Sequence, residues 1–208
     1  MPLLPPLLNP LSNNYVSVSY LIVGLGNIGA EYANTRHNIG FSVLDALAVA
    51  SNTSFSVLRY GSLAQLKIRG KKVWLLKPST YVNLSGKAVN YWMQEERIPL
   101  ENVLIVLDDV ALPFGKLRMR AQGSDGGHNG LKNISAVLGT NAYARLRIGV
   151  GDNFPKGSQV DYVLGTWTNE QVKEMPFILD SATSAVNLFV CEGVSRAMNT
   201  VNTQSSED

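Results

Sequence analysis

Residues 18–29 have the sequence Val-Ser-Tyr-Leu-Ile-Val-Gly-Leu-Gly-Asn-Ile-Gly, in which an apolar run leads directly into three spaced glycines. The run over residues 18–23 is rich in β-branched side chains and predicts a strand, and the glycines predict a tight turn after it. Residues 103–107, Val-Leu-Ile-Val-Leu, predict a second strand that is buried on both faces. Between these strands, apolar residues recur at helical spacing over residues 38–50. Strands that alternate with helices are typical of an α/β fold with a mostly parallel sheet.

The rest of the chain continues this alternation. Further strands are expected over residues 55–58, 63–68, 73–76, 116–120 and 145–150. Helices are expected over residues 85–96, with Ser85 as the N-cap, and over residues 129–138, ended by Gly139. A capping box at Thr168 and Gln171 predicts the start of a long C-terminal helix. That helix is expected to bury Val172, Ile178, Ala182, Val186, Phe189 and Val190, and to hold Cys191 in the core.

The composition favours one globular domain. The chain has 208 residues, of which 45% are hydrophobic and 16% charged, and no repeat or linker divides it. We expect a domain over residues 17–200, a flexible N-terminal extension over residues 1–16, and a polar C-terminal tail over residues 201–208. No apolar run approaches the roughly 18 residues of a membrane span, and no Lys or Arg precedes the first apolar residues as in a secretory signal. Because Cys191 is the only cysteine, a reducing, cytoplasmic location is the simplest interpretation.

The glycines Gly24, Gly26 and Gly29 follow a predicted strand and match the dinucleotide-binding pattern G-x-G-x-x-G. A dinucleotide site also requires a helix that starts at the third glycine and an acidic residue at the end of the next strand. Residues 30–37 are polar and show no helical stripe, and Asp45 falls inside the predicted helix 38–50. We therefore interpret the glycines as a turn that delivers Asn27 to a pocket at the carboxyl end of the strand, where open α/β sheets bind ligands.

The two histidines, His37 and His128, lie in short polar stretches just before predicted helices. Asp108 and Asp109 end an apolar strand, where a carboxylate could fix the tautomer of an imidazole and stabilise its protonated form. No serine lies in a G-x-S-x-G sequence, and the histidines and Cys191 show no metal-ligand spacing. Water is therefore the expected nucleophile and a histidine the expected base, with no metal or cofactor. The alternative is that each histidine is only a surface or helix-capping residue.

Three asparagines occupy comparable positions: Asn27 follows the first strand, and Asn83 and Asn129 lie near the starts of helices. A neutral amide can hold a peptide group, or the developing oxyanion of an ester, without adding charge. Helix capping is the alternative role for Asn83 and Asn129.

Basic residues are expected to gather on one strand. Alternation over residues 116–120 would place three of them on one face, and three later residues could extend the patch: Lys116, Arg118, Arg120, Lys132, Arg145 and Arg147. Phosphate contacts of this kind give nucleic-acid affinity that does not depend on base sequence. The net charge of +2 permits such a partner without requiring it, and an ordinary solvated strand face explains the alternation equally well.

Four segments together resemble the signatures of bacterial-type peptidyl-tRNA hydrolases. They are residues 21–41, which end in Thr-Arg-His-Asn-Ile-Gly-Phe, residues 77–86, Lys-Pro-Ser-Thr-Tyr-Val-Asn-Leu-Ser-Gly, residues 126–132, Gly-Gly-His-Asn-Gly-Leu-Lys, and residues 145–151, Arg-Leu-Arg-Ile-Gly-Val-Gly. Residues 162–165, Tyr-Val-Leu-Gly, also fit, and the order of the segments is the same. The resemblance implies a monomeric α/β domain with a mixed, twisted β-sheet flanked by helices, and hydrolysis of the ester between a peptide and its tRNA.

The resemblance also implies catalytic roles. His37 is the general base and Asp108 orients it, while Asn27 and Asn129 hold the peptide part and the attacking water. Asn83 shapes the same pocket. Just before a helix, the helix dipole disfavours an imidazolium while a carboxylate favours it, and this balance suits a general base that works near neutral pH.

The remaining roles concern the tRNA. Tyr81 is expected to pack against the terminal nucleoside, Arg120 and Arg147 to hold phosphate, and Tyr32 and Lys132 to belong to the same binding set. The chain departs from the family pattern at three positions. Ile28 replaces the usual proline of the first turn, and Asp125 and Asp152 add negative charge, which leaves the tRNA affinity open.

Two other functions stay open. One is an RNA-binding relative that keeps the fold for a non-catalytic task, which the intact catalytic positions argue against. The other is a nucleotide-dependent oxidoreductase, which the polar segment after Gly29 argues against.

Overall fold

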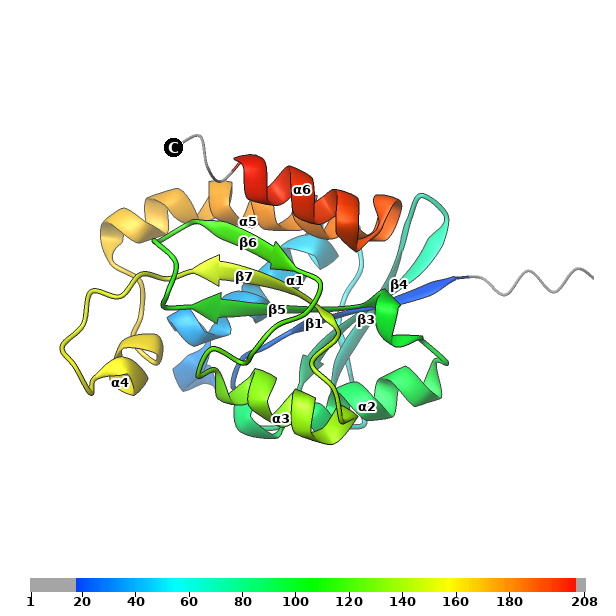
Figure 1. Cartoon of the computed structure of the whole chain (residues 1–208), viewed down its shortest axis with the longest axis horizontal. Helices are drawn as coiled ribbons and strands as arrows, with labels where there is room; N and C mark the ends of the chain where they lie inside the picture. The colour runs from blue at the N-terminus through cyan, green and yellow to red at the C-terminus, as the bar shows by residue number, and fades with distance from the viewer. Residues whose placement is uncertain (1–17, 205–208) are drawn as a thin grey trace, which may run out of the picture.

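The central feature of the computed structural model, which describes residues 18–204, is a seven-stranded sheet in the order β2-β3-β4-β1-β5-β7-β6 (Figure 1). β1 pairs in parallel with β4 and β5, and β5 pairs in parallel with β7, whereas β2, β3 and β6 are antiparallel to their neighbours. The strands are β1 (Ser19–Gly24), β2 (Ser56–Leu58), β3 (Gly61–Ile68), β4 (Lys71–Pro78), β5 (Val103–Asp109), β6 (Leu117–Arg120) and β7 (Ala144–Gly149). The mixed sheet implied by the resemblance is confirmed, and the expected parallel arrangement holds for the four central strands.

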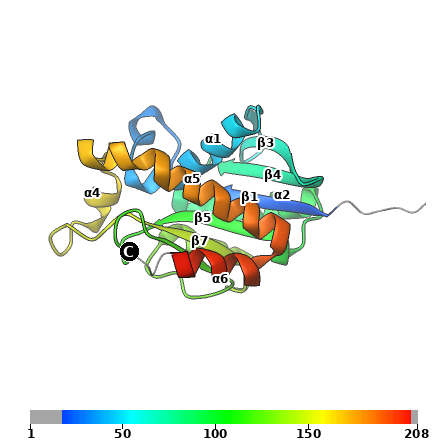
Figure 2. The same ribbon diagram turned by 90° about the horizontal axis from the view of Figure 1, so that it is seen from above.

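Helices cover both faces of the sheet. One face carries α1 (Ile39–Ala50), α5 (Asn169–Glu192) and α6 (Val194–Gln204), and the other carries α2 (Ser85–Glu95) and α3 (Asn129–Leu138) (Figures 1 and 2). The short helix α4 (Gln159–Val163) lies beside the carboxyl ends of the central strands. Within residues 18–204, none of the helices is both long and apolar enough to cross a lipid bilayer.

The central strands are buried because their side chains pack into two hydrophobic cores, one on each face of the sheet. In β1, Ile22 packs into the core under α1 and α5, while Leu21 and Val23 pack into the core under α2 and α3. All seven residues of β5 are buried, as its uninterrupted apolar run predicted. The carboxyl ends of β1, β4, β5 and β7 therefore meet at one edge of a rigid layer, and polar residues follow each of them.

The helices differ from their predictions in four respects. The capping box at Thr168 and Gln171 is confirmed, but the helix stops at Gly193, which has a φ of 81°, and α6 follows. The expected burial of Val172 is wrong, since this residue is 54% exposed in the first turns of α5, which extend beyond the sheet (Figure 1). Cys191 is only half-buried, because it lies next to the buried face of α5 rather than on it. Ser85 is not the N-cap of α2. It is the first helical residue, and its hydroxyl donates to the carbonyl of Val82.

α6 covers the outer edge of β6, and the side chain of Asn202 forms the contact. The Oδ1 atom of Asn202 accepts from the N–H of Met119 at 2.9 Å, and its Nδ2 donates to the Met119 carbonyl at 3.1 Å. This helix continues past residue 200, where the domain boundary is expected, to Gln204, and Val201 is buried. The expected N-terminal extension, residues 1–16, and the end of the chain, residues 205–208, lie outside the described residues.

Candidate active site

A cleft of about 320 Å³ opens where the segments after the central strands converge. Its polar lining residues are Asn27, His37, Tyr81, Asn83, Asp108, Asp109, Asp125, His128, Asn129, Arg147 and Gln159. Apolar residues from α4 and its end, Val160, Val163 and Leu164, form part of its wall. The structure thus brings together most of the expected site residues. Tyr32, Arg120 and Lys132, which are expected to bind the tRNA, do not line this cleft.

His37 is held by Asp108. The residue lies in a 3₁₀ turn, η2 (Arg36–Asn38), directly before α1, and its Nδ1 is 2.8 Å from Oδ1 of Asp108. The two side chains are 11% and 3% exposed. A carboxylate can only accept, so His37 carries its proton on Nδ1 and keeps the lone pair of Nε2 for another partner.

His128 uses both of its ring nitrogens. Its Nε2 is 3.1 Å from the same Oδ1 atom of Asp108, and its Nδ1 accepts from the N–H of Gly130 at 3.1 Å as the N-cap of α3. Since Nδ1 accepts a hydrogen bond, it carries no proton, and Nε2 must be the donor to Asp108. Both ring nitrogens of His128 are therefore engaged and leave no lone pair for a substrate, whereas His37 has one.

Burial disfavours the charged forms of His37 and Asp108, but the contacts among His37, Asp108 and His128 outweigh this effect. Burial alone would lower the pKa of His37, yet the charge and hydrogen bond of Asp108 leave that pKa above the ordinary histidine value. Burial alone would raise the pKa of Asp108, yet His128 and His37 hold it well below its usual range. Asp108 thus remains ionised across the neutral range, and His37 titrates at a higher pH than an ordinary histidine.

Neighbouring residues fix Asn27 in a position that leaves its side-chain nitrogen, Nδ2, available to a ligand. Its Oδ1 accepts from the N–H of Val82 at 2.9 Å, so only Nδ2 remains to act on a ligand. Asn38 holds its backbone on both sides, accepting from the Asn27 N–H at 2.8 Å and donating to the Asn27 carbonyl at 2.9 Å. The side chain of Asn27 is therefore a positioned donor rather than both a donor and an acceptor.

Three further residues form the more open part of the cleft. Tyr81 is 60% exposed and lies just before the 3₁₀ turn η3 (Val82–Leu84), which contains Asn83. Asn129 is the first residue of α3, but His128 is the N-cap, so capping does not occupy its amide. Asn83 and Asn129 are both solvent-exposed at the cleft, where their amides can donate and accept.

Four arginines share one face of β6 and β7. In the antiparallel register Arg118 faces Arg147 and Arg120 faces Arg145, while Leu146, Ile148 and their partners point into the core. Nε of Arg147 is 2.6 Å from Oδ2 of Asp109, which fixes this guanidinium at the rim of the cleft. A basic strand face next to the cleft is therefore present, as expected from the alternation.

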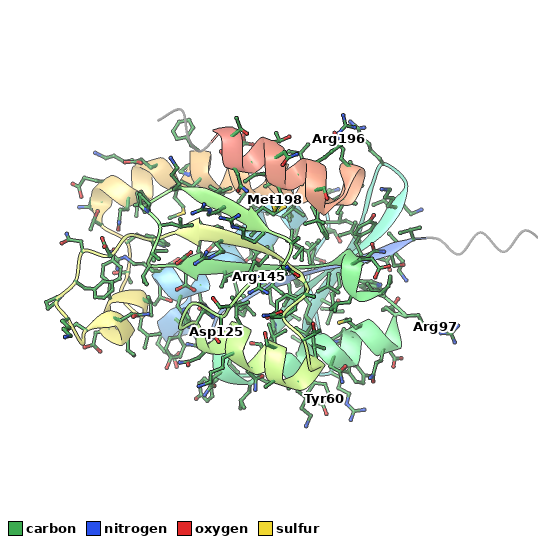
Figure 3. The ribbon with its side chains drawn as sticks, in the orientation of Figure 1. Tyr60, Arg97, Asp125, Arg145, Arg196 and Met198 are labelled. Carbon is green, nitrogen blue, oxygen red and sulfur yellow. The ribbon has the colours of Figure 1, made fainter. Side chains whose placement is uncertain are left out.

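Arg145 lies on that face but does not contribute to its exposed basic surface, contrary to expectation. It is 1% exposed, and it donates to the carbonyls of Gly123, Ser124 and Asn141. The buried Arg145 side chain therefore anchors the glycine-rich loop over residues 123–127 (Figure 3). In that loop, Oδ1 of Asp125 accepts from the N–H of Gly127 at 2.8 Å, and Asp125 lines the cleft. The other added acid, Asp152, is exposed and does not line it.

Comparison with known proteins decides the family. The family model described as peptidyl-tRNA hydrolase matches residues 21–208 of this sequence. The chain belongs to the peptidyl-tRNA hydrolase family. The peptidyl-tRNA hydrolase of Phocaeicola vulgatus is 60% identical over 185 residues, which cover 89% of this chain and 99% of the relative. That of Cytophaga hutchinsonii is 57% identical over 187 residues, which cover 90% and 100% of the two chains.

Solved structures agree with this assignment. The crystal structure of peptidyl-tRNA hydrolase from Acinetobacter baumannii has 38% sequence identity and a TM-score of 0.82, and the match covers 89% of this chain and 95% of that one. A crystal structure of peptidyl-tRNA hydrolase in complex with N-propanol also has 38% identity and a TM-score of 0.82, over 88% and 94% of the chains. The resemblance of the four sequence segments to this family is thus confirmed.

The dinucleotide-like glycines of this family member shape a turn. The third glycine, Gly29, leads into a 3₁₀ turn, η1 (Ala30–Tyr32), instead of an α-helix, and α1 starts only at Ile39. A side chain at Gly24 would collide with the backbone of Gly40, so the glycine permits α1 to approach β1 closely. No helix N-terminus therefore faces the position of a pyrophosphate.

Several features of the cleft were not predicted from the sequence. One is that His37 and His128 share Asp108. The histidines show no metal-ligand spacing in the sequence, yet the donor atoms of His37, Asp108 and His128 lie within 4.8 Å of one another. Their mutual hydrogen bonds account for this arrangement. Asn38 and the apolar wall from α4 also went unassigned, and the only signal for Asn38 was its place beside His37 in the signature.

Proposed function

We propose that this protein hydrolyses the ester bond between the peptide and the tRNA of peptidyl-tRNA, with His37 as the general base that activates water. Membership in the family supports the substrate and the reaction. The observation that carries the choice of base is the way two imidazoles share Asp108. His128 has both nitrogens engaged, whereas Nε2 of His37 has no partner among residues 18–204 and belongs to a cleft-lining side chain.

The reaction follows from these contacts. A water molecule gives a proton to Nε2 of His37 while its oxygen attacks the ester carbonyl carbon, and Asp108 stabilises the imidazolium that forms. The carbonyl oxygen gains negative charge as the tetrahedral intermediate forms. When the intermediate collapses, the ribose oxygen leaves and takes the proton from His37. The products are a peptide with a free carboxyl group and a tRNA with a free hydroxyl group.

The same proposal assigns the binding groups. Asn27, through Nδ2, and Asn129 are proposed to hold the peptide link and the attacking water. Asn83 is proposed to shape the same pocket, and Tyr81 to pack against the terminal nucleoside. Arg147 and Arg120 are proposed to contact tRNA phosphates, with Lys132 and Tyr32 further from the reacting groups. We also propose that the protein works as a monomer, as the family resemblance implies. For a cytoplasmic location, the single cysteine is the supporting observation.

A direct assay tests this function. Purified protein is incubated with N-acetyl-aminoacyl-tRNA, and the released N-acetyl amino acid and deacylated tRNA are quantified. We expect equal amounts of both products, formed with many turnovers per enzyme. No release above the spontaneous rate, from a folded protein, contradicts the proposal.

The Asp108→Asn variant should lower the rate and shift its pH dependence. His37 must be neutral to act as the base, so activity rises with pH through the pKa of His37. Asp108 holds that pKa up against burial, so its loss should lower the pKa and move the acid limb of kcat/KM to lower pH. The maximal rate should still fall, because the imidazolium loses its stabilising charge. An acid limb that stays at the wild-type pH would contradict the pairing.

Arg147→Ala and Arg120→Ala should weaken binding to all tRNAs alike. Each should reduce the slope of log Kd against log salt concentration by about one, as expected for one lost phosphate contact. Cleavage of a short substrate that ends in a few nucleotides should change much less. Arg97→Ala, at an exposed arginine after α2, is the matched control and should leave the slope unchanged. Equal losses on long and short substrates would show that the two arginines support the fold or the chemistry instead.

A further inference from the structure

Arg36 is a buried cation that connects two parts of the cleft. It directly precedes His37 and is 7% exposed. Its NH1 donates to the carbonyl of Tyr162 at 3.2 Å, and its NH2 donates to Oε1 of Gln171 at 3.0 Å. The guanidinium carbon lies 4.3 Å from the ring centroid of Tyr162 and 5.5 Å from that of Trp167. Within residues 18–204 no carboxylate forms an ion pair with Arg36, so these neutral groups hold its charge.

The backbone adds two connections at the same place. The N–H of Arg36 donates to the carbonyl of Gly165 at 3.1 Å, and Thr35 forms an isolated antiparallel bridge with Thr166. A Cβ atom at Gly165 would lie 3.1 Å from NH1 of Arg36, so the glycine leaves room for the guanidinium. The turn that carries His37 is thereby attached to the segment just after α4.

α4 depends on such connections for its position. It has five residues, and only Val163 among them is buried. A helix of this length has little stability of its own. Tyr162 supplies further attachments: its hydroxyl donates to the carbonyl of Val150 at 2.7 Å, and its ring centroid lies 4.7 Å from that of Phe154. Yet Gln159, Val160, Val163 and Leu164 line the cleft, so its placement decides the shape of that wall.

We propose that Arg36 is a positioning residue that fixes the α4 wall of the cleft against the turn carrying His37. A guanidinium suits this task, because its fork reaches two acceptors at once while its flat face stacks on aromatic rings. A lysine ammonium has one donor centre and no planar face. The kinetic part of the proposal rests on the proposed function, since the substrate that meets the preformed wall is peptidyl-tRNA.

Hydrogen–deuterium exchange on the full chain without substrate tests the attachment directly. In Arg36→Met, which keeps most of the side-chain volume, amides over residues 159–166 should exchange roughly tenfold or more faster, the equivalent of one lost charge-assisted hydrogen bond. Amides of β1 and β5 should be unaffected. Arg196→Met is the matched control, because Arg196 is exposed on α6, at the opposite end of the molecule from α4 (Figures 1 and 3). Unchanged exchange over residues 159–166 in Arg36→Met overturns the proposal.

Kinetics separate positioning from catalysis. Arg36→Met should raise KM for N-acetyl-aminoacyl-tRNA by roughly tenfold, change kcat much less, and leave the acid limb of the pH profile in place. Arg36→Lys, which keeps the buried charge and a donor, should fold even if Arg36→Met does not. Arg36→Lys should also raise KM, but by less than Arg36→Met, with kcat and the acid limb again little changed. A fall in kcat with a shifted acid limb and unchanged KM would show that Arg36 acts on His37 instead, and overturns the proposal. If the wild type does not cleave the substrate, the proposed function fails, while the exchange experiment still tests the attachment.

Discussion

His37→Asn is expected to lower kcat/KM by about 10²–10⁴-fold, the usual effect of removing a general base. Asparagine is preferred to alanine because its amide can still donate to Asp108, which is buried and depends on His37 for part of its stabilisation. The substitution therefore removes the lone pair of Nε2 but keeps a hydrogen-bond donor for the carboxylate of Asp108. Initial rates on N-acetyl-aminoacyl-tRNA, with melting temperatures measured alongside, check the result.

His128→Asn is the matched control for this experiment. Asparagine is a good N-cap, so it can replace the acceptor that Gly130 requires. Its activity should fall much less than that of His37→Asn, because no lone pair of His128 is available to a substrate. If His128→Asn is the more damaged enzyme while both variants keep the wild-type melting temperature, the assignment of the base has to be reversed.

The second large effect concerns the acyl group. The enzyme should cleave N-acetyl-aminoacyl-tRNA about 10⁴-fold or more faster than the same tRNA with a free aminoacyl group. The amides of Asn27, Asn83 and Asn129 can pair with a peptide link, whereas a free ammonium would lose hydration without a charged partner. The carboxylates of the cleft are already engaged: Asp108 by two imidazoles, Asp109 by Arg147, and one oxygen of Asp125 by Gly127. Rates of amino acid release from the two forms give the ratio.

Two variants sharpen this comparison. Asn27→Ala should lower activity on the acetylated substrate more than on the free one, because the acetylated substrate uses its donor. Asp125→Asn removes the charge of a cleft carboxylate whose Oδ1 accepts, within residues 18–204, only from the N–H of Gly127, and should lower the residual cleavage of free aminoacyl-tRNA if that carboxylate attracts the ammonium. Equal wild-type rates on both substrates would describe a general esterase, and the peptide-holding role of the asparagines would have to be abandoned.

Local signals in the sequence predicted the strands and their polar ends. The run before Gly24, the run before Asp108 and the capping box at Thr168 each have their cause within a few residues, so each could be recognised. The same signals placed Asn27 and Asp108 at the carboxyl ends of their strands, and because parallel strands end at one edge, both residues line the cleft.

Features that depend on distant contacts could not be predicted in this way. Arg145 alternates with Arg147 just as a surface residue would, and only the glycine-rich loop that folds over it makes it buried. Val172 lies on the apolar stripe of α5 but beyond the sheet that would cover it. His128 contacts Asp108, which is 20 residues away, and Arg36 contacts Tyr162, which is 126 residues away. No periodic pattern in the sequence encodes such pairings.

The contact between Asn202 and Met119 has a consequence for the solubility of the protein. β6 is an outermost strand, and such a strand can recruit the backbone of another molecule and start ordered aggregation. The amide of Asn202 imitates a peptide group and occupies the donor and the acceptor of Met119 that an incoming chain would need. The side chain of Asn202 on α6 thus forms the backbone hydrogen bonds at Met119 that a neighbouring strand would otherwise form. Asn202→Leu should leave ester hydrolysis unchanged while increasing light scattering on prolonged warm incubation.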